Sequence, residues 1–200
     1  MIMKKLLISL ASVMLVLLST IAIAQRPRFI YGNLNAIGNV QRMNVRYDYS
    51  NMEVGKKTEQ EYVAEKRASL NDKSTGKGDK WAESWMADRE RRFEPQFEDA
   101  FNKNSGIQVR PGNNEKYTMI FKTVYTEPGY NVGVVRGNSY IDAEVWIEET
   151  ANPDNVLAKI SISNCAGRNF MGTDFDTGER IQEAYALAGK VLARYIERNL

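Results

Sequence analysis

Two stretches of strictly alternating residues constrain the fold of this chain most. Residues 140–150 and 156–163 place apolar side chains at every second position, with polar or charged side chains between them. This period is that of a strand with one buried face, and the segment 152–155 between the stretches has the composition of a turn. Residues 117–126 are rich in β-branched and aromatic side chains and predict a third strand. Together the three strands are predicted to form an antiparallel meander.

The rest of the chain adds helices and further strands to this sheet. Alternation over residues 43–49 predicts another half-buried strand, and residues 107–109 predict a short one. Thr58 followed by Glu61 has the spacing of a helix capping box, and an apolar face over residues 178–198 predicts a C-terminal helix. The order of elements predicts an α+β fold, a mixed sheet with an antiparallel meander and helices packed mainly on one face.

A long helix that begins near Asp79 carries the heaviest apolar stripe. Its aromatic residues follow a four-residue spacing that only Arg89 interrupts: Trp81, Trp85, Phe93, Phe97 and Phe101. Residues four apart lie on one helix face, so we interpret this aromatic stripe as the core face of the main helix. A ligand-stacking surface is the alternative, and an exposed stripe would indicate a homo-oligomer. Pro95 predicts a kink or break near Glu94.

The first 24 residues have the composition of a secretory signal peptide. A short basic segment precedes an apolar run at 6–18, and the small residues Ala22 and Ala24 stand where a signal peptidase would cleave. We therefore expect residues 1–24 to be removed on export. A membrane tether would follow only if the segment stays uncleaved, an alternative that its nearly membrane-spanning length leaves open.

The residues after the predicted cleavage point indicate the compartment and the domain boundaries. Gln25 stands where a lipoprotein would carry its lipid-bearing cysteine, so we expect a periplasmic or extracellular protein that is not a lipoprotein. Residues 25–39 show no sustained period and predict a flexible leader. The remaining residues, 40–200, have the length of one domain and predict a single α+β domain.

Charge, cysteine and histidine usage exclude several classes of function. The two lysines of the signal segment account for the formal net charge of +2, so the chain from Gln25 onward is balanced and no nucleic-acid partner is expected. The sequence has no histidine and one cysteine, Cys165, which excludes histidine-dependent hydrolysis, intramolecular disulfides and the usual zinc sites. Asp174 and Asp176 have the spacing that opens a calcium loop, but we favour a helix cap at Asp176. No metal or cofactor is therefore expected.

The strand predicted at 140–150 carries the arrangement most typical of a binding or catalytic site. One of its faces carries two aromatic and three acidic residues: Tyr140, Asp142, Glu144, Trp146 and Glu148. Carboxyl groups beside an apolar wall such as a tryptophan are used in glycoside hydrolysis. The alternative is the solvent face of an antiparallel sheet, on which acidic residues oppose aggregation. A long glycine-bearing loop before this strand adds three candidate binding residues, since such loops are often functional: Glu127, Gly129 and Tyr130.

The second half of the sequence resembles bacterial envelope proteins. The run TEPGY, then YIDAEVWIEE, then NVLAKISIS and the terminal ALAGKVLARYI are similar to the pattern of uncharacterised exported proteins and lipoproteins. Their α/β module is similar to the amino-terminal domain of TolB and to CsgG-like periplasmic modules. The resemblance implies a role in envelope assembly or interaction, without an assigned catalytic site.

These observations lead to two functional expectations. The first is an exported, non-enzymatic binding or envelope-assembly domain, whose partner is an envelope protein or a glycan. The second is a small carbohydrate-binding protein or a carboxylate-dependent glycan hydrolase that uses Asp142, Glu144 and Trp146.

Overall fold

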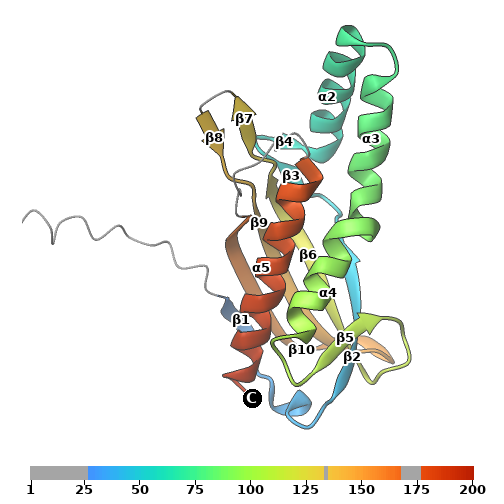
Figure 1. Ribbon diagram of the computed structural model, residues 1–200. Helices are drawn as coiled ribbons and strands as arrows, with labels where there is room; N and C mark the ends of the chain where they lie inside the picture. Colours follow the sequence, from blue (N-terminus) through green and yellow to red (C-terminus); the bar gives the residue numbers. More distant parts are fainter. Residues whose placement is uncertain (1–26, 133–134, 168–176) are drawn as a thin grey trace, which may run out of the picture.

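A mixed β-sheet covered on one face by helices forms the body of the protein, which the computed structural model describes over residues 27–132, 135–167 and 177–200 (Figure 1). The strands lie in the order β1–β10–β9–β6–β2–β5 across the sheet. Their bounds are Arg28–Gly32 for β1, Asn152–Ala166 for β10, Tyr140–Glu149 for β9, Tyr117–Glu127 for β6, Arg42–Asp48 for β2 and Gln108–Pro111 for β5. The fold class is therefore α+β, as predicted.

The predicted meander is present as β6, β9 and β10. Strand β9 pairs antiparallel with both of its neighbours, whereas β2 lies parallel to β5 and to β6, which makes the sheet mixed. The turn between β9 and β10 is tighter than predicted and consists of Thr150 and Ala151. Strand β10 already begins at Asn152, and a register shift between Asn152 and Val156 absorbs the residues expected in the turn.

The expectation of a flexible leader over residues 25–39 is corrected for most of that range. Strand β1 pairs antiparallel with β10 at one edge of the sheet. The following 3₁₀ turn η1 (Asn35–Ile37) brings Leu34 and Ile37 into the core, where 2% and 1% of these residues are exposed. The sequence shows no period here because β1 is short and its register with β10 shifts.

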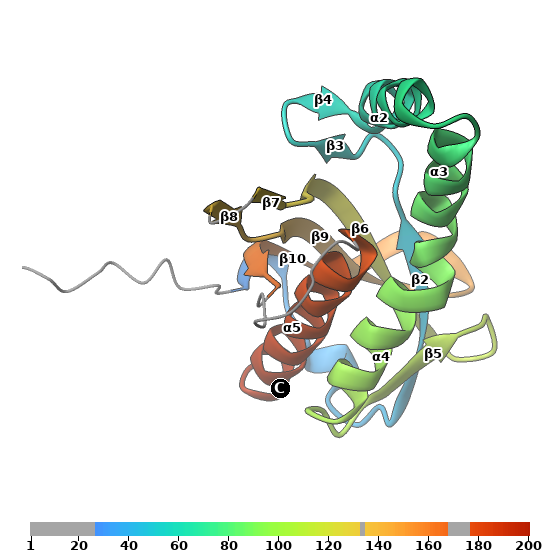
Figure 2. The same ribbon diagram turned by 45° about the horizontal axis from the view of Figure 1, so that its top comes forward.

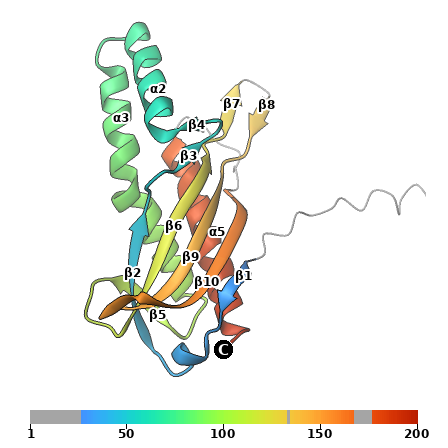
Figure 3. The same cartoon turned by 180° about the vertical axis from the view of Figure 1, so that it is seen from behind.

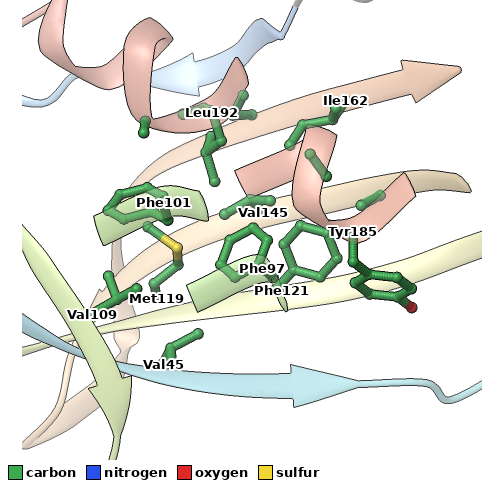
Figure 4. Packing of buried hydrophobic residues seen from close by; sticks show 14 of the residues in the cluster. Val45, Phe97, Phe101, Val109, Met119, Phe121, Val145, Ile162, Tyr185 and Leu192 are labelled. Carbon is green, nitrogen blue, oxygen red and sulfur yellow. The ribbon is translucent and has the colours of Figure 1, made fainter. Parts of the chain in front are cut away.

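Two helices form the layer above the sheet. Helices α4 (Glu94–Asn102) and α5 (Thr177–Glu197) lie side by side over it (Figures 1 and 2). Gly189 of α5 permits this approach, because a Cβ there would lie only 2.4 Å from the carbonyl oxygen of Phe97. Figure 4 shows the resulting core, in which side chains of both helices meet those of the sheet: Phe97, Phe101, Met119, Phe121, Val145, Tyr185 and Leu192.

Helices α2 (Glu59–Lys73) and α3 (Lys77–Asp88) form a hairpin that projects beyond one end of the sheet (Figures 1 and 2). The predicted capping box between Thr58 and Glu61 is present at the start of α2, just after the two short strands β3 (Glu53–Val54) and β4 (Lys57–Thr58). No residue of α2 is buried. The hairpin is therefore an arm with extensive exposed surface.

The break predicted near Glu94 is a π-helical turn, η2 (Arg89–Phe93), which joins α3 to α4. Pro95 follows it in the first turn of α4, and because proline has no backbone N–H to donate to the preceding turn, it accounts for the departure from regular α-helical hydrogen bonding there. The core interpretation of the aromatic stripe is confirmed for four of its five members, which are at most 5% exposed: Trp85, Phe93, Phe97 and Phe101. The stripe therefore provides no exposed patch on which a homo-oligomer could be based.

Several sequence predictions fall outside the described residues. These are the signal peptide at 1–24 and the calcium or capping residues Asp174 and Asp176. Among the helices that the structure describes, none has a stretch of sufficient length and hydropathy to span a bilayer.

Candidate functional site

The face of the sheet opposite α4 and α5 is open, as the view from behind shows (Figure 3). Strand β9 crosses the middle of this open face. Its alternate residues Ile141, Ala143, Val145 and Ile147 are buried toward the helices. The other side chains of β9 lie on the open face together, as their spacing predicts: Tyr140, Asp142, Glu144, Trp146 and Glu148.

Glu148 is the most buried acid of the open face, with 4% of the residue exposed. Its Oε1 accepts a hydrogen bond from Arg46 Nη2 of β2 at 2.5 Å, and its Oε2 accepts one from the indole nitrogen of Trp146 at 2.9 Å. Both carboxylate oxygens thus have donors. The indole of Trp146 is held in a fixed orientation by the same contact.

Glu144 and Trp146 share a cation from the neighbouring strand. Lys159 of β10 lies directly opposite Trp146 in the antiparallel register. Its Nζ is 2.8 Å from Glu144 Oε2 and 5.8 Å from the centre of the Trp146 ring. The contact is therefore an ion pair combined with a cation–π interaction.

Asp142 stabilises a backbone irregularity. Its Oδ1 accepts a hydrogen bond of 2.6 Å from the backbone N–H of Asn164. Asn164 has a φ of 56°, in the left-handed region, and lies where the register between β9 and β10 shifts before Cys165. This carboxylate therefore has a structural contact within the sheet.

The remaining predicted residues cluster where β6 leads into the small hairpin of β7 (Tyr130–Val132) and β8 (Val135–Gly137). Tyr140 stacks on Tyr125 of β6 with ring centres 5.5 Å apart, and Tyr125 donates a hydrogen bond to Glu127. Burial, together with hydrogen bonding to Tyr140, raises the pKa of Tyr125. The other oxygen of Glu127 accepts the backbone N–H of Gly129 at 3.2 Å.

Tyr130 differs from the other predicted residues because half of it, 51%, is exposed. The segment before it is anchored from the helical side by Arg180 of α5, whose Nε donates to the carbonyl oxygen of Pro128 at 3.1 Å. The structure thus places Tyr130 at the start of β7, in the small hairpin that follows a segment anchored by a buried cation.

The three carboxyl groups of the open face all have partners within the sheet. A glycosidase needs one carboxyl group held protonated near a second, ionised one. Here each acid already has a partner on another strand. Asp142 accepts a hydrogen bond from the Asn164 backbone, Glu144 forms an ion pair with Lys159, and Glu148 accepts a hydrogen bond from Arg46. Among the described residues, no cluster of acidic or cysteine side chains could hold a metal ion.

A buried polar cluster, which the sequence does not reveal, lies at the base of the α2–α3 hairpin. Glu59 forms an ion pair with Arg89 and accepts a hydrogen bond of 2.7 Å from the indole nitrogen of Trp85. The Arg89 guanidinium lies 4.2 Å from the centre of the Tyr49 ring, and Tyr49 donates a hydrogen bond to Glu94. This Glu59 cluster, made of Glu59, Trp85, Arg89, Tyr49 and Glu94, connects the hairpin and the π turn to the segment that follows strand β2.

A cleft of about 560 Å³ lies on the helical side of the molecule, between α3, η2 and the first turn of α5. The long-helix wall consists of residues that recur at helical spacing: Lys80, Trp81, Ser84, Trp85, Arg91 and Arg92. On the opposite wall, Gly178 packs so closely that a Cβ would lie 2.1 Å from Asp88 Oδ2. Asp88 also forms an ion pair of 3.2 Å with Arg92.

Of the cleft residues, the sequence singled out only Trp81 and Trp85, as members of the aromatic stripe whose alternative interpretation was a ligand-stacking surface. The signal that could have found the others is the second stripe on the long helix, where Lys80, Ser84 and Arg91 accompany the aromatic residues at spacings of one helical turn or two. The contribution of α5 has no such signal, because Thr177 and Gly178 are brought to the cleft only by tertiary packing.

No protein-family model and no curated protein matches the sequence. Among solved structures, the chain is similar to a PelC dodecamer from Paraburkholderia phytofirmans, with 12% identity and a TM-score of 0.40, over 84% of this chain and 97% of that chain. It is also similar to a single-residue variant of that PelC dodecamer, with 14% identity and a TM-score of 0.41, over 84% of this chain and 95% of that chain.

Proposed function

We propose that this chain is an exported, non-enzymatic binding domain that acts in assembly or interaction within the cell envelope, with a protein partner bound on the open face of the sheet. The observation that carries the proposal is the fixed arrangement of Trp146 between Glu148 and Lys159. Side chains already held in position lose little conformational entropy on binding, so such a surface is pre-organised. Aromatic residues that combine an apolar ring with a polar group are enriched at protein interfaces.

The export part of the proposal is supported by the signal-like segment and by the pattern similarity to TolB amino-terminal and CsgG-like envelope modules. N-terminal sequencing of the protein from its native host should find Gln25 as the first residue. An N-terminus that leaves Gln25 internal would contradict a cleaved signal and would favour a membrane tether.

The binding part is tested by affinity capture from cell-envelope extracts. The wild-type chain should recover a reproducible envelope protein. Lys159→Glu should abolish the capture because it places a second acid beside Glu144 and removes the cation next to Trp146. The matched control is Lys190→Glu, which makes the same charge change at an exposed position of α5. Capture that is unaffected by Lys159→Glu, or lost equally in the control, would exclude the open face as the binding surface.

The absence of catalysis is tested separately with Glu144→Gln. Wild type and variant should show no turnover across a panel of acidic and neutral glycans, because the Glu144 carboxylate is paired with Lys159 at 2.8 Å. Glycan hydrolysis by the wild type that is lost in the variant would overturn the non-enzymatic assignment.

A further inference from the structure

The cleft on the helical side is a second, separate site with the dimensions of a ligand pocket. Its volume of about 560 Å³ lies within the range of roughly 300–1,000 Å³ that is usual for small-ligand sites. The wall from Lys80 to Arg92 follows the long helix for roughly 18 Å, taking about 1.5 Å of rise per residue. The cleft is therefore long enough for an elongated ligand.

The positive charges in the cleft are separated, not gathered at one point. Asp88 is paired with Arg92, but within the described residues neither Lys80 nor Arg91 takes part in an ion pair. Lys80 and Arg91 lie at opposite ends of the helical wall, and the exposed acid of the other wall is Glu179. A single concentrated anion such as phosphate would need converging donors, whereas separated cations favour a ligand whose negative charges are also spaced.

An aromatic surface lies between the two cations. Trp81 is half-buried, and its ring centre is 5.6 Å from that of Trp85 and 5.9 Å from that of Tyr62. These neighbours hold the indole in place, while the Trp85 indole nitrogen is occupied by Glu59. Ser84, which lies between the two tryptophans in the sequence and is exposed, adds a hydrogen-bonding hydroxyl to the same wall.

We propose that this cleft binds a short anionic saccharide, with a sugar ring packed on Trp81 and its carboxylate groups bound by Lys80 and Arg91. The apolar face of a sugar ring matches an indole, and a carboxylate on each ring supplies the spaced charge that the two cations require. The site is distinct from the open face, which lies on the other side of the sheet.

The probe is trigalacturonate, titrated into the purified protein at 150 mM salt and followed by calorimetry. The double variant Lys80→Glu/Arg91→Glu should bind it at least tenfold more weakly than the wild type. The matched control Lys56→Glu/Lys190→Glu makes the same charge change at exposed positions outside the cleft lining. Its affinity for trigalacturonate should lie within about twofold of the wild-type affinity at 150 mM salt, because this salt concentration screens long-range charge effects. Failure of the wild type to bind, or an equal loss in the control, overturns the proposal.

The aromatic and chemical parts of the proposal have their own tests. Trp81→Leu should weaken trigalacturonate binding at least fivefold while circular dichroism shows an unchanged fold, and neutral maltotriose should bind at least tenfold more weakly than trigalacturonate. A triglutamate peptide that binds the wild type as tightly as trigalacturonate would overturn the saccharide assignment. Lys159→Glu should bind trigalacturonate like the wild type, which separates this site from the open face.

Discussion

Glu59 and Arg89 form an ion pair between the start of α2 and the π turn, with only 14% and 16% of their side chains exposed. The hydrogen bond from Trp85 to the same Glu59 oxygen adds α3 to the contact. No residue of α2 is buried, so α2 adds little to the apolar core. We infer that this polar contact stabilises the attachment of the hairpin to the body of the protein.

Removing the Glu59 carboxylate should therefore destabilise the protein. Glu59→Ala leaves Arg89 largely buried without its partner, and we expect a loss of about 3 kcal/mol in the free energy of unfolding. Urea denaturation measures the loss. The control Glu65→Ala removes the exposed ion pair with Lys57 and should cost less than about 1 kcal/mol. Equal losses in the two variants would contradict the role of the Glu59 cluster.

The contact between α4 and α5 depends on the absence of a side chain at Gly189. Gly189→Ala would bring a Cβ to 2.4 Å from the Phe97 carbonyl oxygen and 3.1 Å from the Phe101 backbone nitrogen. Separation of the helices should cost about 1–3 kcal/mol, measured by thermal or urea denaturation. Gly106→Ala is the matched control, because its Cβ would meet its nearest neighbour at an ordinary 3.7 Å and stability should change little. A neutral Gly189→Ala would show that the helices adjust freely.

Stability should fall as the pH rises through the weakly acidic range. Burial raises the pKa of Glu94 and of Glu98 above the ordinary 4.5. The neighbouring Glu90 adds to the rise at Glu94, and Glu94 adds to the rise at Glu98. The folded state therefore binds protons more tightly than the unfolded state. The stability that protonation adds is complete below the unfolded pKa of 4.5, and it is lost as the pH rises through the higher pKa values of the folded state.

Glu98→Gln should flatten this pH dependence. The amide can still accept the hydrogen bond that Tyr47 gives to Glu98, and the repulsion with Glu94 one turn away is removed. Urea denaturation between pH 4 and pH 8 should show a variant that gains stability relative to the wild type as the pH rises. The exposed control Glu83→Gln should keep the wild-type profile. A wild-type profile in Glu98→Gln would contradict the assignment.

Cys165 should be chemically inert in the folded protein. It is 0% exposed, and burial together with the nearby Asp142 raises its pKa to about 12, so little thiolate exists at neutral pH. Ellman's reagent should react with it only after denaturation. Ser163→Cys places a thiol at an exposed position of the same strand and should react at once in the native state. Rapid native reaction of Cys165 itself would show that β10 opens readily.

The strands could be predicted because a two-residue period fixes which side chains share a face, as in β9. Asn44 shows where this reasoning ends. The alternation places it on the polar face of β2, yet only 1% of it is exposed. Its side-chain nitrogen lies within hydrogen-bonding distance of Thr118, Thr150 and the Glu115 carbonyl oxygen, which satisfy its two hydrogens. These partners lie far along the chain, and no local pattern indicates them.

The candidate sites divide in the same way. The residues of β9 were found because they belong to one strand. Lys159, which holds both Glu144 and Trp146, comes from the neighbouring strand, and its position depends on the turn and the register shift between β9 and β10. The saccharide cleft joins α3 to the start of α5, so it required the packed structure.

The π turn η2 holds about one residue more than an ordinary helical turn. Each residue of an α-helix turns the chain by about 100°, so an extra residue in a regular helix would rotate the hairpin of α2 and α3 by about that angle relative to the sheet. The wider turn absorbs the residue locally, and Trp81 keeps its place opposite the first turn of α5. A single-codon deletion is therefore tolerated at this turn, whereas the same change within α3 or α4 would rotate one wall of the cleft away from the other.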